Sequence, residues 1–113
     1  MPSIFERLDN REAFPVQIKR GTIHLREPVF DELKRISALT GELSSALAIA
    51  ICIVESDGSL AFPAEDGETD QALAERVLPQ MKRWLTPSDM KAIEEGIKQL
   101  TKAPDVEELA KNS

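Results

Sequence analysis

The side chains that could do covalent or acid–base chemistry are few in this chain. It contains one histidine, His24, and one cysteine, Cys52. His24 alternates with Ile23 and Leu25 on a predicted strand, so we expect it on the opposite, surface side, with no acid or nucleophile at a fixed spacing. Cys52 lies within an apolar run, where a thiol has a raised pKa and behaves as a small buried hydrophobe. Neither residue predicts catalysis.

Acidic side chains in mid-chain could attract a divalent cation. An EF-hand loop that starts at Asp57 would need a ligand at its fifth place and a glycine at its sixth, but Ala61 stands fifth and Gly58 second. Gly58 and Gly67 are isolated, so no phosphate-binding loop is present. We therefore predict a protein that is not an enzyme and that has no catalytic, cofactor-binding or metal-binding residue. The acidic side chains are interpreted as a solvated loop: Glu65, Asp66, Glu68 and Asp70.

Composition narrows the class of protein further. The chain has 113 residues, a net charge of −6 and 42% hydrophobic residues, which fits one domain. A basic footprint for nucleic acid is absent. The longest apolar run, residues 46–54, is far shorter than the ~20 residues that cross a bilayer, and the first residues do not resemble a secretory signal. We expect a cytoplasmic protein that binds neither nucleic acid nor membrane.

The elements that must position these residues begin with a hairpin. Alternating apolar residues at 16–20 and 22–26, with Gly21 as the turn, predict two antiparallel strands. The outer edge at 16–20 offers an opportunity for pairing with a second copy of the chain. Pro28 then suits the first position of a helix, and Gly41 suits its end.

The remaining segments are mostly helical by pattern. Residues 42–55 predict a buried helix, although 49–54 also fit a buried strand. Residues 70–77 predict a helix, and Pro79 either kinks it or starts a new helix, of which the restart is preferred. Thr86 is a strong N-cap for the next helix. Ser3 could cap a short helix. The predicted fold is α+β, mostly α-helical: a small N-terminal β-hairpin followed by four to five helices in one compact domain, residues 1–103, with a weakly helical or frayed tail at 104–113.

Two apolar groups are candidates for binding a partner. The first is a stripe at helical spacing, in which Phe30 lies beside Val29, Leu33 and Ile36. The second combines residue types that are enriched in interfaces, Met81, Trp84 and Met90. For this second group, a role in the core is the favoured alternative, because a lone Trp in a small domain is more often core.

The order of these segments resembles the tail assembly chaperones of long-tailed bacteriophages. The similarity is carried by GTIHLREP at 21–28 followed by Phe30, by ICIVESDGSLAF at 51–62, by Leu78-Pro79 and Thr86-Pro87, and by VEELAKNS at 106–113. One departure is the segment 84–87, where many members of the family continue an unbroken helix.

The resemblance implies a non-enzymatic chaperone without cofactors, which acts in the cytoplasm of the bacterial host and is absent from the mature virion. Its implied partners are the apolar tape measure protein and the tail-tube protein of the same phage. Three other hypotheses remain at this point: a structural head–tail or tail-completion virion protein, a small acidic antitoxin or regulator, and an enzyme. The last is kept only because a catalytic pair of carboxylates cannot be recognised from sequence.

Overall fold

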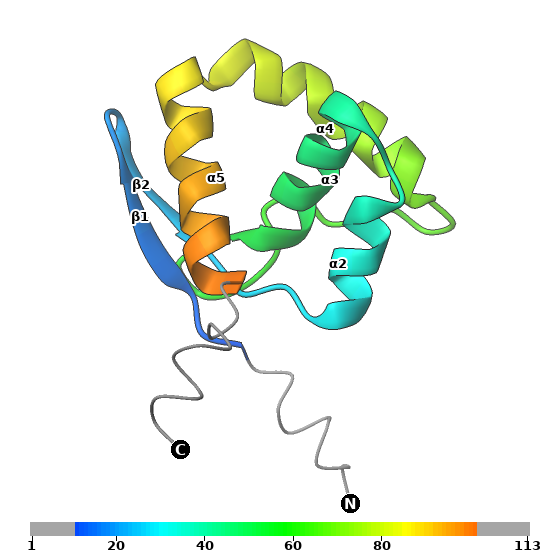
Figure 1. Ribbon diagram of the computed structural model, residues 1–113, viewed down its shortest axis with the longest axis horizontal. Helices are drawn as coiled ribbons and strands as arrows, with labels where there is room; N and C mark the ends of the chain where they lie inside the picture. The colour runs from blue at the N-terminus through cyan, green and yellow to red at the C-terminus, as the bar shows by residue number, and fades with distance from the viewer. Residues whose placement is uncertain (1–10, 102–113) are drawn as a thin grey trace, which may run out of the picture.

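A computed structural model describes residues 11–101 as a three-stranded antiparallel sheet with four helices (Figure 1). The element order is β1 (Phe14–Ile18), β2 (Gly21–Leu25), α2 (Phe30–Ser37), α3 (Gly41–Cys52), β3 (Ile53–Val54), α4 (Asp70–Trp84) and α5 (Pro87–Thr101). The predicted α+β, mostly helical class with an N-terminal hairpin is confirmed. The predicted helix at Ser3 and the predicted tail at 104–113 lie outside the described residues.

The hairpin forms where the alternating apolar residues predict it, but its turn comes before Gly21, the residue predicted to form it. Val16 pairs with Ile23, and Ile18 pairs with Gly21, so Lys19 and Arg20 make the two-residue turn. Gly21 is the first residue of β2 rather than the turn itself. Its φ of +149° is a backbone conformation that side chains with a Cβ rarely adopt, which explains the glycine at this point.

A third strand extends the sheet. The helix α3 ends at Cys52, and the next two residues turn directly into β3, where Ile53 pairs with Leu25 and Val54 with His24. The predicted helix over 42–55 is therefore correct up to Cys52 and wrong at its end. The free edge of β2 supplies backbone partners there, and β-branched residues suit a strand.

The helix α2 begins and ends differently from the prediction. It starts at Phe30 rather than at Pro28, because the Glu32 carboxylate accepts a hydrogen bond from the Val29 amide (3.0 Å) and fixes the first turn there. The helix ends at Ser37. Gly41, with φ +60°, is instead the first residue of α3.

The helix α4 runs without a break through Pro79, so the predicted restart at this residue is wrong. Proline removes one backbone hydrogen bond and crowds the preceding turn. Pro79 lies on the exposed side of the helix, where the carbonyl left without a partner can face water. The opposite side buries Leu73, Ala74 and Val77, and this packing keeps the helix continuous.

The start of α5 follows the predicted cap. Thr86 Oγ1 accepts a hydrogen bond from the Asp89 amide (3.1 Å), and the Asp89 carboxylate accepts one from the Thr86 amide (3.0 Å). This reciprocal arrangement satisfies two amides that have no partner within the helix. Asp89 also pairs with Arg20 of the hairpin turn at 2.8 Å, so the cap ties α5 to the sheet.

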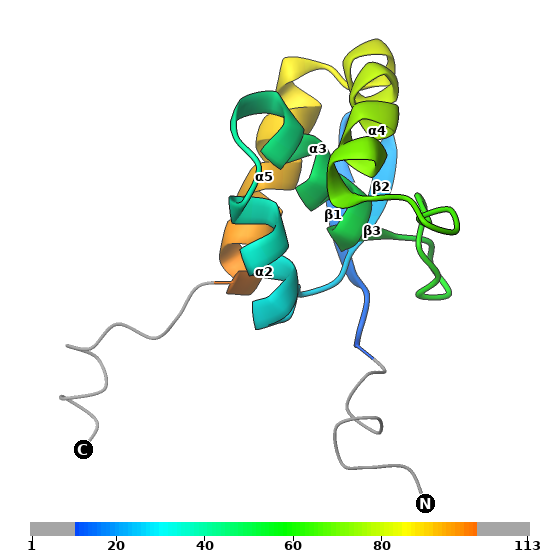
Figure 2. The same cartoon turned by 90° about the vertical axis from the view of Figure 1, so that its right-hand side faces the viewer.

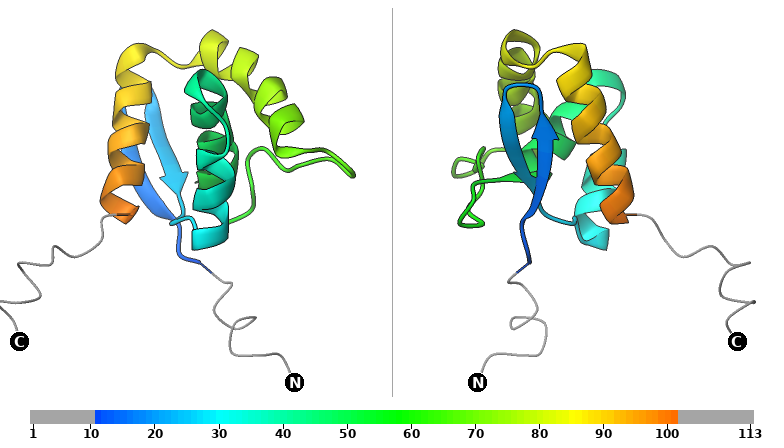
Figure 3. Two further views of the ribbon diagram at one scale, coloured as in Figure 1. Left: turned by 45° about the vertical axis from the view of Figure 1, so that its right-hand side comes forward. Right: turned by 90° about the vertical axis from the view of Figure 1, so that its left-hand side faces the viewer.

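The helices gather on one face of the sheet, with α3 at the centre of the molecule (Figures 1 and 3). The helix α3 packs most extensively against α4, while α5 packs against β1. In the view of Figure 2, α2 stands beside α3, and the segment between β3 and α4 projects away from the helices. The largest fully buried apolar side chains come from four different elements: Leu25, Leu47, Val77 and Ile93.

Candidate interaction grooves

The first predicted binding group does not form one surface. Val29, Phe30 and Leu33 are exposed on α2, with Phe30 the most exposed at 87%. Ile36, in the next turn, is partly buried against the core. The stripe therefore divides, because the helix turns its last apolar position toward α3 and its first ones toward solvent.

The second predicted group divides as well. Trp84 is 60% exposed, whereas Met81 and Met90 are partly buried against the core. The favoured alternative of a core role therefore fits the two methionines and is wrong for the tryptophan. Trp84 is the last residue of α4 and Met90 lies in α5, so the two face different grooves.

One groove, called the Ile36 groove, lies between α3 and α5. Its volume is about 230 Å³. The helix α5 contributes Met90, Ile93 and Ile97, while α3 contributes the small residues Ser44, Ser45 and Ala48. Ile36 and Met90 thus come together from the two predicted groups, and no periodicity of a single helix could have paired them.

The other groove, called the Trp84 groove, lies between α4 and the sheet. Its volume is about 200 Å³, and it is lined mainly by apolar side chains from β2, β3, the segment before α4, and α4 itself: Ile23, Ile53, Phe62, Val77, Met81 and Trp84. The sequence indicated Met81 and Trp84 but missed Ile23 and Phe62.

Two guanidinium groups contact Trp84, which lines this groove. The Arg83 guanidinium lies over the Trp84 ring, 5.4 Å from its centroid. Arg20 donates a hydrogen bond to the Trp84 carbonyl oxygen and also forms an ion pair with Asp89 at 2.8 Å. No motif in the sequence marks these two cations as neighbours, because Arg20 lies in the hairpin turn and Arg83 in α4.

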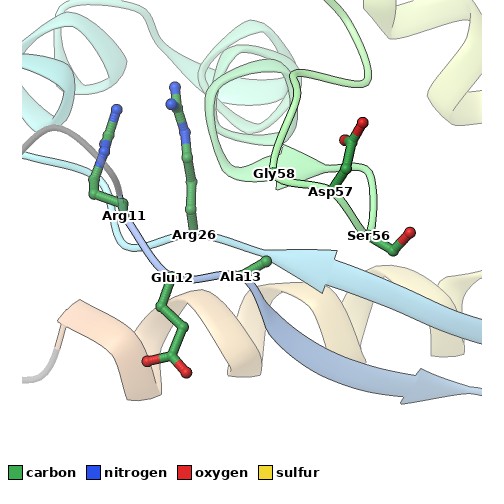
Figure 4. A pocket seen from close by; sticks show the side chains of 7 residues that line it. All are labelled: Arg11, Glu12, Ala13, Arg26, Ser56, Asp57 and Gly58. Carbon is green, nitrogen blue, oxygen red and sulfur yellow. The ribbon is translucent and has the colours of Figure 1, made fainter.

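A polar pocket of about 290 Å³ lies between the start of β1 and the turn at Asp57 and Gly58 (Figure 4). Arg11 and Arg26 line it, and both pair with the carboxylate of Glu32. Arg26 Nε also donates to the Ile51 carbonyl oxygen at 3.0 Å, at the C-terminal end of α3. These guanidinium groups link the residues that flank the hairpin to α2 and α3, which makes the cluster structural.

The electrostatics of this cluster favour an ionised Glu32. Burial alone would raise the pKa of the carboxyl, but the hydrogen bonds from Arg11 and from the Val29 amide, with the charges of both arginines, hold the pKa below its ordinary value. The nearby thiol of Cys52 is fully buried. Burial first, and then the charge of Glu32, raises the pKa of Cys52 to about 11. The prediction of a buried small hydrophobe at Cys52 is confirmed.

Two of the acidic side chains that were interpreted as a solvated loop have structural partners. Glu68 pairs with Arg76 at 2.8 Å, and Asp70 pairs with Arg35 at 2.7 Å. The hydrogen bond from Arg76 lowers the pKa of Glu68 to about 2. Within residues 11–101, the structure brings together no group of three His, Cys, Asp or Glu side chains that could hold a metal ion.

His24 is half-buried rather than fully on the surface, at a register position between Pro15 and Val54. In the part of the chain that the structure describes, no helix has both the length and the apolar character needed to span a membrane. Comparison of the chain with protein-family models, with curated proteins and with solved structures gave no match. The function is therefore argued from the grooves and from the sequence resemblance.

Proposed function

We propose that this protein is a phage tail assembly chaperone, which binds the apolar tape measure protein and tail-tube subunits without catalysis. The proposal starts from the ordered motifs that resemble this family, above all GTIHLREP at 21–28 and the segment 51–62. It includes the expectation that the protein acts in the cytoplasm of the bacterial host and is left out of the finished virion.

The Trp84 groove is the observation that carries the proposal. A chaperone of this kind must offer apolar surface to a long helical client, and a helix that lays its apolar side chains into a groove is a common mode of recognition. The groove ends at a large exposed aromatic side chain, Trp84, and tryptophan is among the residues that contribute most to binding energy at interfaces.

Further features support the same function. Val29, Phe30 and Leu33 leave a second apolar surface uncovered on α2. The net charge of −6 opposes the self-association that exposed apolar surface otherwise promotes. A protein that keeps an insoluble client in solution needs both properties at once.

Co-expression with the tape measure protein of the same phage tests the proposal. We expect the tape measure protein to stay in the soluble fraction with the wild-type chain and to aggregate without it. The variant Trp84→Ala should lose most of this effect, while Lys91→Ala on the exposed side of α5 should keep it. Equal aggregation with and without the wild-type chain would contradict the proposal.

Mass spectrometry of purified phage particles tests the expectation that the protein is left out of the finished virion. We expect no peptide of this chain in finished virions, although the tail-tube protein is present in many copies. Detection at a stoichiometric level would instead support a structural head–tail or tail-completion protein.

A further inference from the structure

The Trp84 groove has an electrostatic character that differs from that of the whole protein. The chain carries a net charge of −6, yet the guanidinium groups of Arg20 and Arg83 both lie at the Trp84 end of the groove. Because Arg20 is neutralised by Asp89, the uncompensated positive charge beside Trp84 within residues 11–101 is that of Arg83, on a protein that is acidic as a whole. Such an arrangement selects among amphipathic partners by the charge beside their apolar residues.

The cations at this end differ in what they can offer a partner. Arg20 is paired with Asp89 at 2.8 Å. Arg83 forms no ion pair with a carboxylate anywhere in residues 11–101; its contact is with the Trp84 ring. Arg83 is thus the cation that can pair with an incoming carboxylate without first breaking an existing ion pair.

We infer that the Trp84 groove binds an amphipathic helix whose apolar side chain enters the groove while an acidic side chain on the same helix face pairs with Arg83. Residues three or four positions apart share a helix face, so the partner motif is an apolar residue with Glu or Asp at that spacing. This inference rests on the proposed function and specifies the kind of client segment. A basic helix is disfavoured because it would place like charges together at Arg83.

The test uses the tryptophan of the groove as its own reporter, since Trp84 is the only tryptophan in the chain. The probes are two synthetic helical peptides without tryptophan, which share one Leu/Phe face and carry either Glu or Lys at the flanking positions. We expect the Glu peptide to shift the emission of Trp84 saturably in the full chain. Its dissociation constant should be roughly three- to tenfold lower than that of the Lys peptide at low salt, with the ratio approaching one at about 1 M salt.

Matched variants distinguish the contribution of the charge at Arg83 from that of the apolar surface at Trp84. Arg83→Glu should reverse the preference between the two peptides, whereas Lys91→Glu makes the same change of charge at an exposed position of α5 outside the groove and should leave the preference intact. Trp84→Ala should weaken both peptides by roughly tenfold or more, measured by the anisotropy of a labelled peptide. Far-UV circular dichroism identifies the variants that keep their fold.

Equal affinity for the two peptides, or an unchanged preference in Arg83→Glu, would overturn the inference. So would a dimer in sedimentation equilibrium that is lost in Trp84→Ala and that excludes both peptides, because the occupant would then be a second copy of the chain. The co-expression assay separates this result from the proposed function: a wild-type chain that solubilises the tape measure protein but shows no acidic preference leaves the function standing and refutes only the choice of partner.

Discussion

The close approach of α5 to the sheet gives the sharpest test of the fold. A Cβ placed on Gly96 would lie 2.9 Å from Leu25 Cδ1 and 3.0 Å from Val16 Cγ2, well inside the optimal carbon–carbon separation of about 3.5–4.0 Å. Leu25 is fully buried and cannot move into solvent. The glycine is therefore required by packing, although it lies within a helix.

Two opposing effects set the change in the free energy of unfolding that we expect for Gly96→Ala. Replacing Gly with Ala inside a helix stabilises it by about 1 kcal/mol where space is available, while overpacking a filled core costs about 1–3 kcal/mol. We expect Gly96→Ala to lower the free energy of unfolding by about 1 kcal/mol, which corresponds to a loss of roughly 4–8 °C in Tm. Gly96→Val, with a larger and branched side chain, should lose considerably more.

Urea unfolding, followed by Trp84 fluorescence and by circular dichroism, measures these changes. In the exposed part of α5, Gln99→Gly compared with Gln99→Ala gives the helix-propensity effect alone, about 1 kcal/mol in favour of Ala. In a protein that already carries Val16→Ala, the substitution Gly96→Ala should lower the free energy of unfolding by less than it does in the wild type. The shorter side chain at position 16 leaves space for the new methyl group. If Gly96→Ala were more stable than the wild type by the full propensity effect, the packing argument would be refuted.

The other predictions concern the ionic contacts and the buried thiol. Glu32→Gln should destabilise the protein by about 2–3 kcal/mol, less than the loss of a fully buried pair, because its partly solvated arginines lose their shared carboxylate; urea unfolding measures this. Since the pKa of Glu68 is lowered from 4.5 to about 2, the stability contributed by its pair with Arg76 is complete above pH 4.5 and lost as the pH falls toward 2. The urea midpoint of Glu68→Gln should therefore vary less over this range than that of the wild type; an identical slope would contradict the assignment. Cys52, with its pKa raised to about 11, should react with a thiol reagent at pH 8 only as fast as the protein unfolds, and rapid labelling of the native protein would be inconsistent with its burial.

The features that sequence analysis predicted correctly are encoded locally. The hairpin follows from a period of two around a tight turn, and the cap of α5 follows from Thr86 with Asp89 three residues later. The burial of Cys52 follows from the apolar residues on both sides of it. For the hairpin and the cap, the interaction partners lie close together in the chain; for Cys52, only the sequence signal is local, because its apolar neighbours predict the burial that other elements provide.

The errors arise where a distant segment supplies the deciding contact. Pro79 predicts a break, yet the helix continues because its other side packs on α3. The short strand Ile53–Val54 exists because the edge of β2 is free to pair with it. Local preferences of about 1 kcal/mol are outweighed in such places by burial and pairing.

By itself, the sequence determined the class of fold, the hairpin, the strongest helix cap and a set of apolar residues that supplies part of the lining of each groove. The tertiary structure decided how that set is divided: Ile36 joins Met90 in one groove, while Met81 and Trp84 join Ile23 in the other. Periodicity places residues on one face of one element, but a groove lies between elements, and its lining depends on how their faces pack together.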